Sequence, residues 1–189
     1  IMKKMKPIII AEIANSHYGN EDRLIKICKK LKKAGAKNIK FQMFKTKHLV
    51  SKCHKSFDLF KKLEISHKTW KKVSEIIKDF NFNIYCDIFD EESLSISDLL
   101  KPKGIKIHSS SINDLELIKK CAIKCNEIIL STGGSKNIDV KNAIIEIRKV
   151  SGSANIIVMN GVQVFPTPLE DACLHSIYSL RQEFEEFEV

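Results

Sequence analysis

Residues 104–111 read GIKIHSSS, and this stretch decides how the fold is interpreted. Its first four residues have the apolar character of a buried strand, yet Lys106 stands in the middle of them. A lysine is almost never fully buried unless an opposite charge accompanies it. The stretch NIKFQMF (residues 38–44) repeats the pattern at Lys40. Two lysines of this kind predict a shared anion at the ends of two strands.

Runs of strand character alternate with segments of helical period along the chain. We predict six strands, at Pro7–Ala14, Asn38–Met43, Asn83–Ile88, Gly104–His108, Glu127–Ser131 and Asn155–Asn160. Their apolar, β-branched composition is typical of strands buried on both faces of a parallel sheet. Amphipathic helices are predicted between them. The last helix is predicted to begin at TPLE, with Thr167 as its N-cap and Glu170 completing a capping box.

This strict alternation predicts an α/β protein, for which two architectures compete. A doubly wound sheet would usually carry a glycine-rich nucleotide loop after its first strand, but residues 12–21, EIANSHYGNE, hold no such motif. A (β/α)8 barrel has eight units and roughly 250 residues. We therefore predict the (β/α)8 TIM-barrel type, as one barrel domain over residues 1–189 with about six of the eight units present. The long connection 45–66 is predicted to be a lid or a surface excursion.

Composition narrows the classes of function. The formal charge of +9 comes almost wholly from lysines spread over helix faces with few aromatics among them, so nucleic-acid binding is not expected. No apolar stretch is long enough to cross a membrane, so no membrane association is expected. The six cysteines match no zinc or haem spacing, which indicates reduced, buried thiols and a cytoplasmic protein.

Polar residues gather where the predicted strands end, the edge at which barrels and open α/β sheets bind ligands. In chain order they include Glu12, Lys40, Gln42, Asp87, Lys106, Ser109, Ser131, Asn160 and Gln163. Lysines supply positive charge, while serine hydroxyls and backbone N–H groups supply short donors for phosphate oxygens. A plainer interpretation stays open, because a strand lysine can also reach the rim or pair with a carboxylate such as Glu12 or Asp87.

Five motifs, IAEIANSHYGN, IKFQMFK, GIKIHSSS, IILSTGGS and FPTPLED, stand in the order and spacing of the sialic acid synthase (N-acetylneuraminate synthase) family. The chain resembles this family over essentially its whole length. The resemblance implies a (β/α)8 catalytic domain. It also implies an enzyme that condenses phosphoenolpyruvate with an N-acetylated amino sugar, typically N-acetylmannosamine, into a nonulosonic acid and releases phosphate.

The resemblance implies a role for each matching residue. The catalytic set is then Glu12, Lys40 and Gln42. The residues that resemble the phosphoenolpyruvate site, two lysines for its phosphate and carboxylate and two hydroxyl donors, are Lys40, Lys106, Ser109 and Ser131. Glu12 and Gln42 resemble residues that face the reacting centre and the sugar.

Several positions depart from the family pattern, and the resemblance places them toward the sugar together with Gln42: Asp87, Asn160, Gln163 and Phe165. Asp87 lies in the stretch CDIFD, where many members have a small hydroxyl residue on the phosphate side. These departures resemble the divergent branch of spore coat polysaccharide synthases.

The family resemblance implies a divalent metal, Mn²⁺ or Mg²⁺, that polarises the sugar aldehyde. Its two histidine ligands come from strands seven and eight, which are not expected in residues 1–189, so no metal ligand is expected in this chain. An antifreeze-like C-terminal domain and a homodimer are expected of the full-length form. A barrel with six strands would expose strand edges, and aggregation or oligomerisation is expected to follow.

Two alternatives remain open. A related phosphoenolpyruvate-dependent sugar-acid synthase would use a phosphorylated aldose in place of the amino sugar, although FPTPLED and IILSTGGS favour the first interpretation. An inactive truncated module would bind a ligand or partner without doing chemistry.

Overall fold

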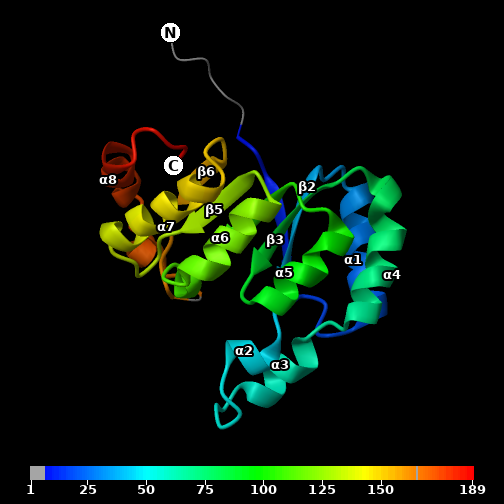
Figure 1. Ribbon diagram of the computed structural model, residues 1–189. Coiled ribbons are helices and arrows are strands. Elements are labelled where there is room, and N and C mark those ends of the chain that lie inside the picture. Colours follow the sequence, from blue (N-terminus) through cyan, green and yellow to red (C-terminus); the bar gives the residue numbers. More distant parts are fainter. Residues whose placement is uncertain (1–6, 165) are drawn as a thin grey trace.

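The described residues, 7–164 and 166–189 of a computed structural model, form one sheet with helices packed against it (Figure 1). The six strands are β1 (Ile10–Ala14), β2 (Asn38–Met43), β3 (Asn83–Ile88), β4 (Gly104–Ile107), β5 (Glu127–Ser131) and β6 (Asn155–Met159). The helices are α1 (Glu21–Lys33), α2 (Thr46–Leu49), α3 (Phe57–Leu63), α4 (His67–Ile77), α5 (Glu91–Ser97), α6 (Leu115–Lys124), α7 (Asn137–Val150) and α8 (Ser176–Glu183). All six predicted strands are present, and β1 begins at Ile10 instead of Pro7.

Each strand pairs in parallel with the strand that follows it in the chain, which gives the order β1-β2-β3-β4-β5-β6. A doubly wound sheet would reverse its order at a switch point. An unbroken sequential order is instead that of a barrel wall. The sheet therefore confirms the predicted α/β fold of the TIM-barrel type.

The two faces of the sheet differ in chemistry. Apolar side chains at alternate positions, among them Ile39, Phe41, Ile105 and Ile107, pack into the core with the helices. The intervening positions carry Asn38, Lys40, Gln42, Asn83, Tyr85, Asp87, Gly104 and Lys106 on the opposite, inner face. The prediction of strands buried on both faces is confirmed for β3 and β4, where the inner-face residues Tyr85, Asp87 and Lys106 are buried as well. The inner face is polar along β2 to β4 and becomes apolar at Ile129 of β5.

Local signals fix where the main helices begin. Four of them start at an N-cap whose side chain accepts a backbone N–H from the first turn, namely Asn20, Ser66, Asp90 and Asp114. Such caps satisfy donors that have no partner inside the helix. The helices that begin at these caps pack on the apolar face of the sheet. The polar inner face is therefore left available for a site.

The connection 45–66 folds as α2 and α3, which project from the body of the molecule as a surface excursion (Figure 1). Glu64 holds the start of this excursion in place. Its carboxylate accepts hydrogen bonds from the Thr46 N–H at 3.0 Å and from Lys45 Nζ at 3.3 Å. The Phe44 and Phe60 rings meet edge to face with centroids 5.8 Å apart. The excursion is therefore packed onto the barrel wall by both polar and aromatic contacts.

The predicted helix start at TPLE is wrong. Residues Leu169–Ala172 form only a short 3₁₀ turn, and α8 begins later, at Ser176. Leu169 is exposed, whereas Leu180 and Phe184 are buried in the core. A capping sequence is a local signal, and a helix gains most of its stability only where an apolar face can pack.

Beyond α8 the chain returns to the sheet. The Val158 N–H donates to the Glu188 carbonyl at 2.8 Å, and Glu188 forms a parallel bridge with Ile157. Phe187 and Val189 pack against the core beside it. This contact is an isolated bridge beside β6 and not a further strand, so the sheet of the described residues keeps the six strands that were predicted.

The cysteines are all free thiols. Four are buried, and burial raises the pKa of Cys28 and Cys121 to about 12. Cys53 and Cys173 are exposed, so the prediction of buried thiols is wrong for these two. No helix in the described part of the chain is long and apolar enough to cross a bilayer.

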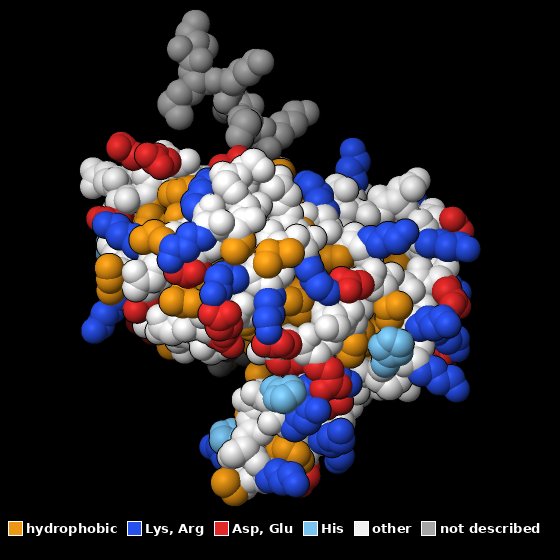
Figure 2. Space-filling view, viewed as in Figure 1, with side chains coloured by type: hydrophobic (Ala, Val, Ile, Leu, Met, Phe, Trp, Pro, Cys, Tyr) orange, Lys and Arg blue, Asp and Glu red, His pale blue; other side chains and the backbone are white. Residues whose placement is uncertain are grey.

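The positive charge is distributed over the surface. Figure 2 shows Lys and Arg side chains spread across the helical face with carboxylates among them. Surface pairs such as Lys47–Glu92 at 2.8 Å and Lys124–Asp98 at 2.6 Å illustrate this mixing. The charge on this face is therefore locally balanced and not gathered into one basic stripe.

Candidate active site

Three charged side chains from neighbouring strands meet on the inner face of the sheet. Asp87 of β3 pairs with Lys40 of β2 at 3.3 Å and with Lys106 of β4 at 2.9 Å. All three are buried, with Asp87 only 1% exposed and the lysines 8% and 7%. Buried charges persist only when paired. The alternative interpretation, in which a strand lysine pairs with a carboxylate of the protein, is therefore correct for both lysines.

Glu12 of β1 extends this row. Its Oε2 lies 2.8 Å from Lys40 Nζ, and its Oε1 accepts the Ala14 N–H at 3.0 Å. Ala14 has a φ of 45° and marks an irregularity in the β1–β2 register directly after Glu12. A bulge of this kind re-aims the side chain beside it. Four adjacent strands thus carry a charged row, which we define as Glu12, Lys40, Asp87 and Lys106.

The charged row keeps Lys40 protonated. Burial acts to lower the pKa of Lys40, but the carboxylates of Asp87 and Glu12 outweigh it, so the pKa is raised above its ordinary value. Lys40 is therefore a cation at neutral pH despite its burial. A cation held in low-dielectric surroundings is well suited to binding an anionic group.

Gln42 lies on the same face as Lys40, opposite Asp87 in the β2–β3 register. Asn15, in the loop after β1, donates from Nδ2 to Gln42 Oε1 at 3.2 Å. The Asn15 Oδ1 is buried and has no hydrogen-bond partner among the described residues. Most buried polar atoms do have a partner. Asn15, which the sequence analysis did not include in the site, therefore offers an acceptor next to the predicted sugar contact Gln42.

The ends of β4, β5 and β6 bring further predicted residues together. Gln163 donates from Nε2 to Ser109 Oγ and, at 3.1 Å, to the Gly133 carbonyl. Ser131 lies beside Gly161, where a Cβ atom would come within 3.5 Å of Ser131 Oγ. These contacts join two predicted phosphoenolpyruvate residues and one predicted sugar residue into a polar rim at the carboxyl ends of the strands.

One predicted sugar contact lies apart from this rim, and another is not among the described residues. Asn160 accepts a hydrogen bond from Ser176 Oγ at 2.8 Å, so its side chain contacts the start of α8. Phe165 lies outside the described residues. The remaining predicted residues belong either to the charged row, to the Gln42 region or to the rim.

His108 was given no role in the predicted site, although the sequence places it at the end of β4 on the face of Lys106. It stands two residues beyond Lys106, and its ring lies against the Phe89 ring with centroids 5.2 Å apart. Burial, with Lys106 nearby, lowers the pKa of His108, so it is neutral at pH 7. The alternation of side chains in GIKIHSSS places it on the face of Lys106, and this spacing was the signal that could have identified it.

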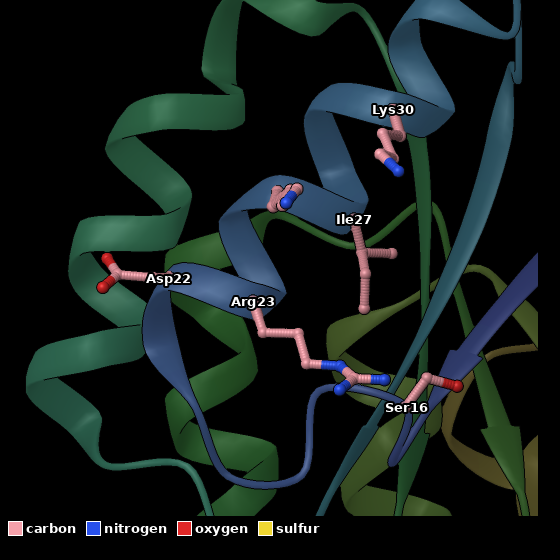
Figure 3. Close-up of a pocket in the computed structure, with 6 residues that line it drawn as sticks. Ser16, Asp22, Arg23, Ile27 and Lys30 are labelled. Carbon is pink, nitrogen blue, oxygen red and sulfur yellow. The ribbon is translucent and has the colours of Figure 1, made fainter.

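A surface hollow of about 570 Å³ lies elsewhere, along α1 (Figure 3). Ser16, Asp22, Arg23, Lys26, Ile27 and Lys30 line it. Its lining comes mainly from one exposed helix, and Arg23 is already engaged over the Tyr18 ring at 4.5 Å. Convergence of groups from several strand ends is the stronger mark of a site in this fold, and it points to the charged row.

The expected metal was compared with the donors present. No group of three or more His, Cys, Asp or Glu side chains in the described part of the chain is placed to hold a metal ion. The residues described here therefore do not make up a metal site by themselves.

The sequential parallel sheet, with the charged row buried on its inner face, defines a barrel-type α/β protein. The NeuB family model matches residues 27–189, and the chain belongs to the NeuB family. This confirms the resemblance to sialic acid synthases found in the sequence.

Similar proteins agree with this assignment. N,N'-diacetyllegionaminic acid synthase of Legionella pneumophila is 26% identical and matches 96% of this chain and 56% of its own length. The B. subtilis spore coat polysaccharide biosynthesis protein SpsE has a structure with a TM-score of 0.81 at 29% identity, covering 98% of this chain and 52% of that one. Sialic acid synthetase of Leptospira borgpetersenii gives a TM-score of 0.84 at 23% identity, covering 94% and 62%, which shows a shared fold. The chain spans about half the length of the curated relatives it matches.

Proposed function

We propose that this protein acts as a nonulosonic acid synthase that condenses phosphoenolpyruvate with an N-acetylated amino sugar similar to N-acetylmannosamine. The observation that carries the proposal is the convergence of two buried lysines, from β2 and β4, at the carboxyl edge of a barrel wall. Membership of the NeuB family and the names of its synthase relatives support the reaction class.

In the proposed reaction, carbon three of phosphoenolpyruvate forms a bond to the aldehyde carbon of the sugar, whose oxygen takes up a proton. Water adds at carbon two, and the bond from carbon two to the phosphate oxygen breaks, releasing phosphate. Lys40 and Lys106 hold the anionic groups by charge-assisted bonds, and Ser109 and Ser131 donate to their oxygens. Glu12, within reach of Lys40, is placed to move the proton.

The sugar would lie on the Gln42 side of the charged row. The residues proposed to contact it are Gln42, Asp87, Asn160, Gln163 and Phe165. Asn160 has the least support, because Ser176 already donates to its side chain. A divalent metal, Mn²⁺ or Mg²⁺, would polarise the aldehyde when bound, and a homodimer is the proposed assembly of the full-length form.

The proposal is tested by substituting Lys106→Met in the full-length form and measuring phosphate release with both substrates present. Loss of one charge-assisted contact to the transferring group is expected to lower kcat/KM by about a thousandfold. Lys68→Met is the matched control, since Lys68 is exposed on α4. Turnover that survives Lys106→Met unchanged would contradict the proposal.

The same assay separates the acceptors. N-acetylmannosamine and a phosphorylated aldose are supplied in parallel, with and without added Mn²⁺. Phosphate release with the amino sugar alone is expected. Release with the phosphorylated aldose alone would identify the protein as a sugar-acid synthase that acts on phosphorylated aldoses. Release with neither acceptor would indicate a module that binds a ligand without catalysis.

A further inference from the structure

We propose that Asp87 exchanges a proton when the two lysines take up an anion, so that it is a carboxylate while it bridges Lys40 and Lys106 and a carboxylic acid once the anion is their partner. The inference deepens the proposed function and rests on it for the identity of the natural anion. Asp87 would then determine how strongly this site binds fully ionised phosphate groups.

The charge of the row motivates this exchange. Lys40 and Lys106 contribute two positive charges, and Glu12 and Asp87 contribute two negative charges, so the row is neutral as it stands. A dianion beside these lysines would leave the buried site with a net negative charge. Like charges a few ångströms apart in a poorly solvated site repel strongly. Uptake of one proton removes part of that repulsion.

Asp87 is the group of the row best placed to take that proton. Its side chain is only 1% exposed, whereas that of Glu12 is 41% exposed and can be stabilised by water. Asp87 also contacts both lysines, so it competes with the anion for the same N–H donors. As a carboxylic acid it gains an O–H donor, which can bond to an oxygen of the anion.

The surroundings of Asp87 contain one other candidate. Lys40 faces it from β2 and Lys106 from β4, with Glu12 of β1 beyond Lys40. His108, at the end of β4, is neutral at pH 7, because burial and the charge of Lys106 lower its pKa. An anion near Lys106 would also favour protonation of this imidazole. A test of the proposal therefore has to separate Asp87 from His108.

Isothermal titration calorimetry with sulfate provides this test. Sulfate stays a dianion across neutral pH, so any proton taken up on binding comes to the protein and not to the ligand. Titrations in two buffers with different ionisation enthalpies count the protons. We expect uptake of about one proton for each sulfate, and an affinity that falls about tenfold for each unit of rising pH.

Three variants show which residue takes up the proton. Asp87→Asn is expected to abolish the uptake, flatten the pH dependence and bind sulfate at least tenfold more tightly at alkaline pH. His108→Asn is expected to retain the uptake, and Asp98→Asn, which removes a carboxylate that pairs with Lys124 at the surface, is expected to behave as the unmodified protein. Circular dichroism establishes that each variant is folded. If Asp87→Asn does not fold, proton counting in the unmodified protein, in His108→Asn and in Glu12→Gln decides the matter, since uptake retained in both variants leaves Asp87 as the acceptor.

Any of these results would overturn the proposal: no sulfate binding at millimolar concentrations, binding without proton uptake, uptake retained in folded Asp87→Asn, or uptake lost in His108→Asn. The phosphate-release assay is independent of all of them. Proton-coupled sulfate binding without turnover would reject the proposed function and leave the role of Asp87 intact. Turnover together with sulfate binding that takes up no proton would support the proposed function and reject the role of Asp87.

Discussion

Lys40 stands between two carboxylates, and its charge holds the first half of the charged row together. Glu12 lies 2.8 Å and Asp87 3.3 Å from its Nζ. Substitution by methionine would keep most of the apolar stem but would leave the two carboxylates without this cation. Removing one partner of a buried pair costs about 3 kcal/mol or more. Lys40→Met is therefore expected to lower the free energy of unfolding by about 3 kcal/mol in urea at neutral pH, with Lys68→Met as the control.

The same lysine predicts a pH dependence with a definite sign. The pKa of Lys40 in the folded protein is raised above its ordinary value of 10.5. The stability that this raised pKa contributes is fully present below 10.5 and is lost as pH rises through the folded value. The stability difference between the unmodified protein and Lys40→Met is expected to be constant from neutral pH to about pH 10 and to shrink above it. A difference that grows in alkali would contradict the assignment.

Part of the site could be predicted from single residues. A lysine inside an apolar run is unusual enough to single out Lys40 and Lys106, and the alternation of side chains gives their shared face. Pairing of such a lysine with Glu12 or Asp87 was an open alternative, but the sequence could not settle it, because the pairing depends on which strands are neighbours and in which register. His108 had the right spacing, but nothing in the sequence distinguished it from an ordinary residue at a strand end.

At the scale of elements, the excursion formed by α2 and α3 depends on one glycine. Gly19 has a φ of +73°, and a Cβ atom there would lie 1.7 Å from the Lys62 carbonyl oxygen at the end of α3. Alanine at this position would have to push the α1 entry loop and α3 apart. The close approach of two backbones therefore requires glycine, beyond the requirement of its dihedral angle.

Three alanine substitutions separate these contributions. Gly152→Ala has open space and no positive φ and is expected to leave stability unchanged. Gly35 has a φ of +78° and open space around it, so Gly35→Ala is expected to lower the free energy of unfolding by about 1 kcal/mol through backbone strain alone. Gly19→Ala is expected to cost clearly more and to increase hydrogen exchange in residues 45–66. Equal melting temperatures for Gly19→Ala and Gly35→Ala would show that α3 does not press on this loop.

The elements also show where local signals mislead. The strands were predictable because β-branched runs lie between strong helix caps such as Asn20 and Asp114. The capping pattern at Thr167 satisfied the same rule, yet α8 begins only at Ser176, near the residues that it can bury. Periodicity gave the positions of the strands and the shared face of Lys40 and Gln42, but not the neighbours across that face. Asp87 contacts both lysines only because β3 lies between β2 and β4.

At the scale of the whole molecule, the barrel wall has an open side in the described residues. The outer edge of β1 pairs with no strand within 7–164 and 166–189, and Ile8 and Ile9 are exposed just before it. Exposed strand edges and apolar side chains favour association between chains. The 189-residue chain is therefore expected to form dimers or larger assemblies, with a mass that rises with concentration in light scattering after size exclusion.

The part that the β1 edge plays in this association can be checked with a substitution beside that edge. Ile9→Lys places a charge next to the unpaired edge, a device that blocks edge-to-edge pairing. It is expected to shift the chain toward the monomer, whereas Ile145→Lys, on the exposed side of α7, is not. A monodisperse monomer for the unmodified chain at high concentration would contradict this expectation.

The sequential order of the strands also governs how the protein acquires its structure over time. Since each strand pairs with the one made just before it, most contacts join segments that are close in the chain, and the sheet can grow by one βα unit at a time. Each new unit covers the edge left by its predecessor, so assembly can proceed from the N-terminus during synthesis. The charged row is completed with β4, so the paired lysines and carboxylates can form before β5 and β6 have left the ribosome.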